Sequence, residues 1–415
     1  LAEVLKDHRF KNEAFVRRAI SANLRVATPA TLQNLVDYAN FEGAPAVLRN
    51  EAIDALSTWA KPSVLDRVDG RFRGEITRPV EPAQQAASAS LVKLSSHQDA
   101  QIRLHATRAM GKLHIDAAAG KLMDLLKKDP NADVRIAAVK SLAQLKGVDM
   151  DAAISTALGD KEKSVRVTGL DLLNGSSLSN DRKVALLDNV IITRTPEEKQ
   201  AAITTLGSLP LAGTEKVFSR LVGQMEKGSL QREVWIELAD ALDSNGAKAL
   251  RQRYDAVSAK AGPDSLKALY AGALAGGDPN KGMQIFWGDG AAQCVRCHAI
   301  SDYGGHVGPN LSGIADRLKK EQLLEALIEP SARIAPGYGL MTLELKDGQK
   351  VNGTMEAEKA DSYVMKVGDK SGVVVKKTDV AKRIDSPSGM PPMHLLLTKK
   401  EIRDVVAFLS QQHAK

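Results

Sequence analysis

The sequence predicts a mainly α-helical chain, in which a solenoid of repeated helix pairs precedes a smaller C-terminal domain with a small inserted antiparallel β-sheet. Segments repeat about every 32 residues through the first two-thirds of the chain. Both cysteines lie in one motif, Cys294–His298, and residues 340–384 change to the alternating pattern of short strands. We place the solenoid at residues 1–275 and the C-terminal domain at residues 276–415.

The composition limits the classes of function. The chain has 415 residues, of which 43% are hydrophobic and 4% aromatic, and its formal net charge is +7. The mild positive excess indicates an acidic partner surface or nothing specific, and no basic and aromatic patch points to nucleic acid. No run of 18 apolar residues predicts a membrane span. The chain opens at Leu1 in a helical pattern, without a signal peptide, so we expect a processed product or the downstream part of a longer polypeptide.

The repeats align on a basic residue followed by apolar residues three and seven positions later. Successive anchors are 32, 54, 32, 31, 33 and 33 residues apart. Each unit is expected to form two helices whose small +3 and large +7 residues face the next unit, giving about seven stacked pairs. The anchors are Arg17, Arg49, Arg103, Arg135, Arg166, Lys199 and Arg232.

The longest spacing contains 22 extra residues near 61–85, a stretch rich in proline, glycine and arginine. It predicts a surface loop between repeats. Several units have an aspartate in the turn, followed at fixed positions by arginine, alanine and leucine. This pattern resembles HEAT-like repeats, although the unit is shorter than the usual 40–47 or so residues. That resemblance implies an α-solenoid; an irregular helical bundle is the alternative.

The motif Cys294-Val295-Arg296-Cys297-His298 is typical of covalent haem attachment. Two thiols add to the two vinyl groups of a haem c, and the following histidine becomes the proximal iron ligand. A zinc site needs four ligands, typically with a second cysteine pair, and the chain has no further cysteine. The motif therefore predicts one haem c bound through Cys294, Cys297 and His298. Because such haems are attached outside the cytoplasmic membrane, we expect a periplasmic or comparable location.

Methionine is the usual second ligand in electron-transfer cytochromes. Downstream of the motif the sequence reads Gly389-Met390-Pro391-Pro392-Met393. We favour Met390 as the axial ligand, because Pro391 fixes the backbone directly after it. Met393 is the alternative ligand, and as a core residue it would play the usual role of methionine.

The remaining C-terminal pattern predicts a helix capped by Asp278, a helix from about Lys319 to Ile328, and a last helix from Thr398 to Gln411. Between them, Leu340 to Leu345 alternates and ends at Asp347-Gly348, a hairpin signal. We expect a small antiparallel sheet over about 340–384.

From Gly282 onward these motifs resemble a class I-type cytochrome c domain. Gly308-Pro309-Asn310-Leu311 is similar to that family's loop in which the proline shapes the proximal pocket and the leucine covers the ring. Phe286, Trp287 and Tyr338 are further candidates for the haem pocket, and each is equally compatible with an ordinary core position.

The sequences of three segments are similar to those of a haem-binding domain common in planctomycetes and verrucomicrobia. These segments are Gly305–Ile314, Leu324–Ser331 and Pro336–Tyr338. In that family the cytochrome follows helical repeats, and a β-propeller similar to quinoprotein sugar dehydrogenases often precedes both. The resemblance implies electron transfer from a dehydrogenase, such as a quinoprotein sugar or alcohol dehydrogenase present as a fused domain or a redox partner protein, with the solenoid as docking scaffold. The alternative is a haem-based sensor or a protein-binding scaffold. No catalytic motif is seen in the chain, and its oligomeric state is left open.

Overall fold

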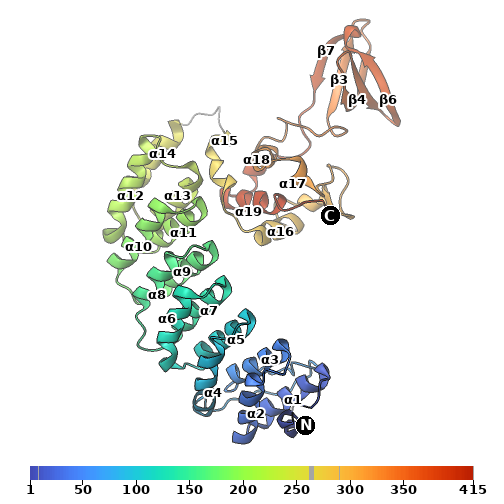
Figure 1. The fold of residues 1–415 in the computed structure, drawn as a ribbon. Helices are drawn as coiled ribbons and strands as arrows, with labels where there is room; N and C mark the ends of the chain where they lie inside the picture. Colours follow the sequence, from blue (N-terminus) through green and yellow to red (C-terminus); the bar gives the residue numbers. More distant parts are fainter. Residues whose placement is uncertain (8, 261–265, 289, 415) are drawn as a thin grey trace. The chain divides into compact units, whose positions relative to one another are not determined.

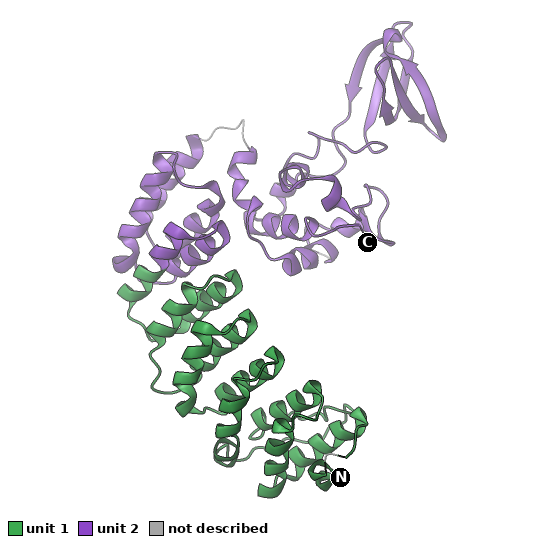
Figure 2. Cartoon of the chain, in the orientation of Figure 1, with its two compact units in different colours: residues 1–186 green, residues 187–415 purple. Residues whose placement is uncertain are grey.

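The computed structural model describes residues 1–7, 9–260, 266–288 and 290–414. The chain divides into two compact units, residues 1–186 and 187–415 (Figure 2). This division falls inside helix α10 (Asn180–Thr193), so the last helix pairs belong to the same unit as the C-terminal domain. The boundary predicted from the sequence, at 275/276, lies within the second unit. It falls between the short helix η5 (Ala271–Leu274) and helix α16 (Pro279–Trp287). None of the described helices is long and apolar enough to cross a membrane.

The first unit is built from helices that pair along the chain (Figure 1). Alternate helices α1, α3, α5, α7 and α9 pack on one another in turn, each accompanied by the helix before or after it. Asparagine, aspartate or threonine side chains cap several of their N-termini. The helices are α1 (Glu13–Val26), α2 (Pro29–Asn40), α3 (Ala46–Ser57), α4 (Glu81–Leu94), α5 (Ala100–Lys112), α6 (Ala119–Lys128), α7 (Ala132–Leu142), α8 (Met150–Leu158) and α9 (Lys163–Gly175).

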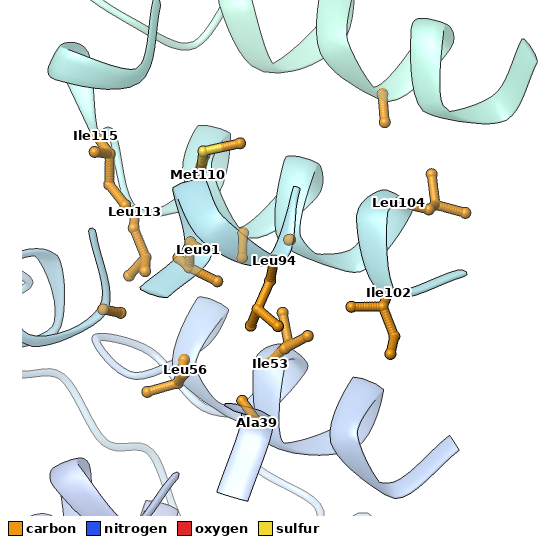
Figure 3. Close-up of a cluster of buried hydrophobic side chains, with 14 of the residues drawn as sticks. Ala39, Ile53, Leu56, Leu91, Leu94, Ile102, Leu104, Met110, Leu113 and Ile115 are labelled. Carbon is orange, nitrogen blue, oxygen red and sulfur yellow. The ribbon is translucent and has the colours of Figure 1, made fainter. Parts of the chain in front are cut away.

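The core of this unit follows the small and large positions of the repeat. Ala52, Ala106 and Ala138 are fully buried, as are the large residues four positions after each of them. In Figure 3, Ile53 and Leu56 of α3 lie below the side chains of α4 and α5, which form the next layer. The small residues let neighbouring helices approach closely, and the large ones fill the shared interior.

Two of the anchor arginines join their repeats to a carboxylate in the turn of the next repeat. Nε and Nη2 of Arg103 donate to both carboxylate oxygens of Asp129 at 2.7 and 2.9 Å. Arg135 makes the same bidentate contact with Asp160 at 2.7 and 2.8 Å, and its Nη1 donates to the Asp129 carbonyl at 2.8 Å. We call this series the arginine ladder. In the sequence, the basic residue served only to align the repeats. At Arg103 and Arg135 it is a nearly buried link between neighbouring repeats.

The predicted register of the last repeat is wrong by three residues. Arg232 lies in a 3-10 turn, η3 (Arg232–Val234), before helix α13 (Trp235–Ser244) begins. Its +3 and +7 positions, Trp235 and Ala239, are only half-buried. Leu238 and Leu242 are fully buried instead, so Trp235 occupies the anchor position and no basic residue marks it.

The Pro/Gly-rich insertion before α4 is a loop held against the first repeats. A single β-bridge joins Leu65 to Phe72 within it. The Arg78 guanidinium stacks 4.5 Å from the centre of the Trp59 ring and donates to the Leu24 carbonyl at 2.8 Å. The insertion therefore packs on its own repeats, although the Phe72 side chain remains 72% exposed.

The second unit continues the helix pairs and ends in a compact helical domain (Figure 1). In that domain α16 packs against the last helix, α19 (Lys399–Leu409), as its most extensive helix contact. A Cβ at Gly282 would lie 2.8 Å from Phe408 Cβ, so only glycine permits this crossing. The other helices of the unit are α11 (Pro196–Gly207), α12 (Leu211–Glu226), α14 (Lys248–Lys260), α15 (Leu266–Leu269), α17 (Ile314–Arg317) and α18 (Lys320–Ile328).

The predicted sheet is present as an antiparallel sheet of five strands in the order β6-β5-β4-β3-β7. It has its own small core, formed by Met341, Leu343, Met365 and Val375. The sequence did not predict the last strand, which pairs with β3 and extends the sheet to Asp385. The strands are β3 (Leu340–Leu345), β4 (Lys350–Glu358), β5 (Ser362–Val367), β6 (Lys370–Lys376) and β7 (Val380–Asp385).

Candidate haem site

The side chains of the two cysteines and of His298 project from one short turn and the residues directly after it. Residues Cys294–Arg296 form a 3-10 turn, η6, in which the Cys294 carbonyl accepts from Cys297 N at 3.1 Å and from His298 N at 2.9 Å. Both cysteines are free thiols; Cys294 is half-buried and Cys297 is exposed. The turn thus presents two thiols and an imidazole within five residues, the donor set required for a haem c.

A glycine-rich loop encloses this turn. The short strands β1 (Ala299–Ile300) and β2 (Tyr303–Gly304) reverse the chain, and the loop then returns along the motif. Gly305 N donates to the Val295 carbonyl at 2.8 Å, and Gly308 N donates to the Cys297 carbonyl at 2.7 Å. A Cβ at Gly305 would overlap the backbone carbonyl of the motif, so the loop closes this tightly because it lacks side chains there.

The loop also fixes the imidazole of His298. The Pro309 carbonyl lies 2.9 Å from Nδ1, and because a carbonyl only accepts, Nδ1 carries the proton. Nε2 is then the nitrogen with an available lone pair. The Gly308 backbone packs closely against the ring: a Cβ there would lie 2.6 Å from Cε1 of His298. The histidine is held in one tautomer and one orientation, as a metal-ligating histidine requires.

The residues after Pro309 anchor the loop to the domain. Leu311 N donates to the Ala299 carbonyl at 2.8 Å, and Asn310 Nδ2 donates to the Ser301 carbonyl at 3.2 Å. The Leu311 side chain packs against the main hydrophobic cluster of the domain. Pro309 and Leu311 therefore lie beside the motif.

Both segments of the candidate site pack against that cluster, which is called the C-terminal cluster below. Among the half-buried side chains packed against it are Cys294, Leu311 and Met390. Segments almost 100 residues apart in sequence thus share one apolar surface. Its buried members are Tyr270, Ala273, Phe286, Ile314, Leu323, Leu324, Leu327, Ile328, Met393, Leu397, Ile402, Val405, Val406, Phe408 and Leu409.

The two candidate methionine ligands have different environments. Met390 is half-buried at the rim of the C-terminal cluster, in a segment that we call the distal loop, residues 388–397. Met393 is 3% exposed and belongs to the cluster itself, within the short helix η8 (Met393–Leu395). A thioether that binds iron must reach the surface of the pocket, so the burial pattern favours Met390 over Met393.

The aromatic candidates for the haem pocket, and the histidine of the distal loop, have different environments. Phe286 is 1% exposed and packs 5.6 Å from the Phe408 ring, at the crossing of α16 and α19. Trp287 is 37% exposed, and Tyr338 is 42% exposed in the segment before β3, outside the C-terminal cluster. His394 Nδ1 lies 3.1 Å from the Ile328 carbonyl. Phe286 therefore has the environment of a core residue.

Burial raises the pKa of the Cys294 thiol, and the neighbouring Cys297 adds to this effect. The thiol is therefore protonated at neutral pH, which disfavours its oxidation, since the thiolate is the reactive form. In the part of the chain that the structure describes, no three His, Cys, Asp or Glu side chains gather as a metal-binding group.

Large apolar side chains are exposed on the segments that flank the motif. Val307, in the glycine-rich loop after the motif, is 78% exposed, and Leu395, in the distal loop, is 72% exposed. A hollow of about 430 Å³ is lined by residues of α16, of the segment just before the motif, of the distal loop and of α19. Ile285, Ala292 and Leu396 are among its apolar lining residues, and charged side chains of α16 and α19 complete it. Exposed apolar surface of this kind marks a binding site. The exposed apolar side chains beside the fixed imidazole and the two thiols suit a flat, largely apolar group such as haem.

Sequence reasoning did not foresee how the motif turn is fixed. The acceptors are backbone carbonyls of Val295, Cys297 and Pro309, which carry no sequence signal of their own. The available signal was the glycine run at 304–308, since closely spaced glycines indicate close backbone approach.

Comparison with known proteins identifies only the helical repeats. A family model for HEAT repeats matches residues 88–174, so this part of the solenoid consists of HEAT repeats. No curated protein matches the chain. Among solved structures, human deoxyhypusine hydroxylase in complex with glycerol is similar at 15% identity over 65% of this chain and 91% of that chain. Its TM-score is 0.27, too low to support an argument.

Proposed function

We propose that this chain binds one haem c covalently, with His298 and Met390 as axial ligands, and transfers electrons outside the cytoplasmic membrane. The single observation that carries the proposal is the imidazole of His298. Its Nδ1 is committed to the Pro309 carbonyl at 2.9 Å, and it directly follows two free thiols on one turn. A structural histidine has no need of this combination.

The chain's own residues would hold the group. The Sγ–H of Cys294 and of Cys297 would each add across one vinyl group, forming an S–C bond while the hydrogen goes to the neighbouring vinyl carbon. His298 would bind through Nε2, with the hydrogen bond at Nδ1 raising its basicity. When bound, a haem with both axial positions filled supplies a one-electron redox centre without an open site for substrate.

The HEAT repeats supply the proposed route to a partner. Solenoids of this kind present extended surfaces for other proteins, and the resemblance described above implies a dehydrogenase as electron donor. We propose that the solenoid docks such a donor, either a separate redox protein or a fused quinoprotein-type domain. No catalytic role is proposed for the chain itself.

Covalent attachment is tested by expressing the chain with a haem c maturation apparatus and staining a denaturing gel for haem. We expect a strong band for the native sequence, weaker bands for Cys294→Ala and Cys297→Ala, and none for the double variant. A Gly389→Ala variant, whose added Cβ meets no atom within 4 Å, is the matched control and should stain fully. Full staining of the double cysteine variant would overturn the proposal.

A visible spectrum of the oxidised protein separates electron transfer from ligand sensing. We expect a six-coordinate, low-spin spectrum with the weak far-red band of methionine ligation. A five-coordinate, high-spin spectrum would contradict the electron-transfer proposal and favour a haem-based sensor.

A further inference from the structure

We propose that Glu237, in the last pair of solenoid helices, is a positioning residue for the haem site. Its buried ion pair with Arg403 fixes helix α19, and α19 in turn fixes the distal loop that carries Met390. The solenoid would then be a structural part of the haem domain, and not only a docking surface attached to it. This inference rests on the proposed role of Met390 as iron ligand.

The ion pair joins helices α13 and α19 across 166 residues of sequence. Nη1 of Arg403 lies 2.5 Å from Oε1 of Glu237, and the side chains are 11% and 2% exposed. The second carboxylate oxygen of Glu237 and Nε of Arg403 are buried without a hydrogen-bond partner in the described part of the chain. Each charge therefore depends on the other for its compensation, because a buried charge without its partner is strongly unfavourable.

The chain between solenoid and α16 is packed into the same contact. Nε2 of Gln200 donates to the carbonyls of Glu233 at 2.7 Å and Ala275 at 3.0 Å. A Cβ at Gly277 would lie 2.8 Å from the Arg403 carbonyl, so the connecting segment runs directly against α19. The ion pair is thus the centre of a tightly packed contact and not an isolated bridge.

The distal loop leads directly into the N-terminus of helix α19. Thr398 caps the helix through a reciprocal pair of hydrogen bonds with Glu401, and Leu397 N donates to the Met393 carbonyl at 2.8 Å. Met393 is buried in the C-terminal cluster, three residues after Met390. A displacement of α19 therefore moves the loop that presents the Met390 thioether.

The same two helices carry a control pair. Asp240 and Lys400 each lie three residues from a member of the buried pair and also form an ion pair, but they are 50% and 42% exposed. Exposed pairs contribute little to stability. The two pairs therefore share the same helices and differ in burial.

The experiment compares Glu237→Gln, Arg403→Gln, the charge-reversed double variant E237R/R403E, and the control Asp240→Asn. In haem-loaded protein, the readouts are the far-red methionine-ligation band and the reduction potential. We expect both single variants at the buried pair to weaken the band and shift the potential, the reversed pair to restore them at least partly, and the control to match the native protein. A band and potential unchanged in Glu237→Gln would overturn the positioning role.

A second arm requires no haem. In the chain with both cysteines replaced by alanine, hydrogen exchange reports the opening of α19. We expect Glu237→Gln to accelerate exchange in α19 on the order of a hundredfold, and the control to change it by less than about fivefold. Unchanged α19 exchange would overturn the inference whether or not the chain binds haem. Accelerated exchange without haem attachment would keep the helix contact and reject the proposed function instead.

Discussion

Replacing Gly308 by alanine tests the packing that orients His298. The added Cβ would lie 2.6 Å from Cε1 of His298 and 2.8 Å from its Nδ1. Carbon atoms in contact are normally about 3.5 Å apart or more, so the ring must move by about 1 Å. That movement stretches the 2.9 Å contact between Nδ1 and the Pro309 carbonyl beyond hydrogen-bond range. We expect a cost of about 1–3 kcal/mol from overpacking and about 1 kcal/mol from the lost hydrogen bond.

The assay measures urea unfolding of the apoprotein and haem stain per mole of protein. We expect Gly308→Ala to lower both the unfolding free energy and the haem content, whereas Gly389→Ala, with open space around its added Cβ, should change neither. If Gly308→Ala matched the native protein in haem content and stability, the loop would not fix the imidazole and the reasoning would fail.

Three further predictions concern the ligand, the sheet and the ladder. Met390→His should lower the reduction potential by more than about 100 mV, because imidazole stabilises ferric iron better than a thioether does, while Met393→Leu should barely move it; the opposite result in a redox titration would exchange the two assignments. Replacing residues 340–385 by a short glycine linker should leave the haem spectrum largely unchanged, because the sheet has its own core; loss of the spectrum would show that the sheet completes the pocket. Arg135→Met should destabilise the first unit by about 3 kcal/mol, because it breaks a buried pair, against less than about 1 kcal/mol for the exposed Arg182→Met; equal urea midpoints would refute the difference.

Periodic features of the fold could be predicted from the sequence because each depends on local pattern. The near-32-residue spacing gave the helix pairs, and the alternation from Leu340 gave the first strands. The helix starts at Asp278 and Thr398 could also be predicted, since these side chains accept hydrogen bonds from amides only two or three residues away. Such contacts need no knowledge of the tertiary structure.

Features that depend on long-range packing could not be predicted. Strand β7 has little apolar pattern, and it is a strand because it pairs with β3. The last repeat was misaligned because Arg232 looks like an anchor while tertiary packing buries Leu238 and Leu242. At the candidate site, the motif itself was readable, but the carbonyl that orients His298 was not.

The arginine ladder gives the solenoid a direction. Both links run from the arginine of one repeat to a carboxylate of the repeat that follows, from Arg103 to Asp129 and from Arg135 to Asp160. The repeat between them therefore presents a carboxylate, Asp129, to the repeat before it and a guanidinium, Arg135, to the repeat after it. Repeats in a stacked array depend on their neighbours, and here each neighbour must supply a charge of one sign. The two faces of this repeat are therefore not interchangeable, and it can stack on its neighbours in only one order.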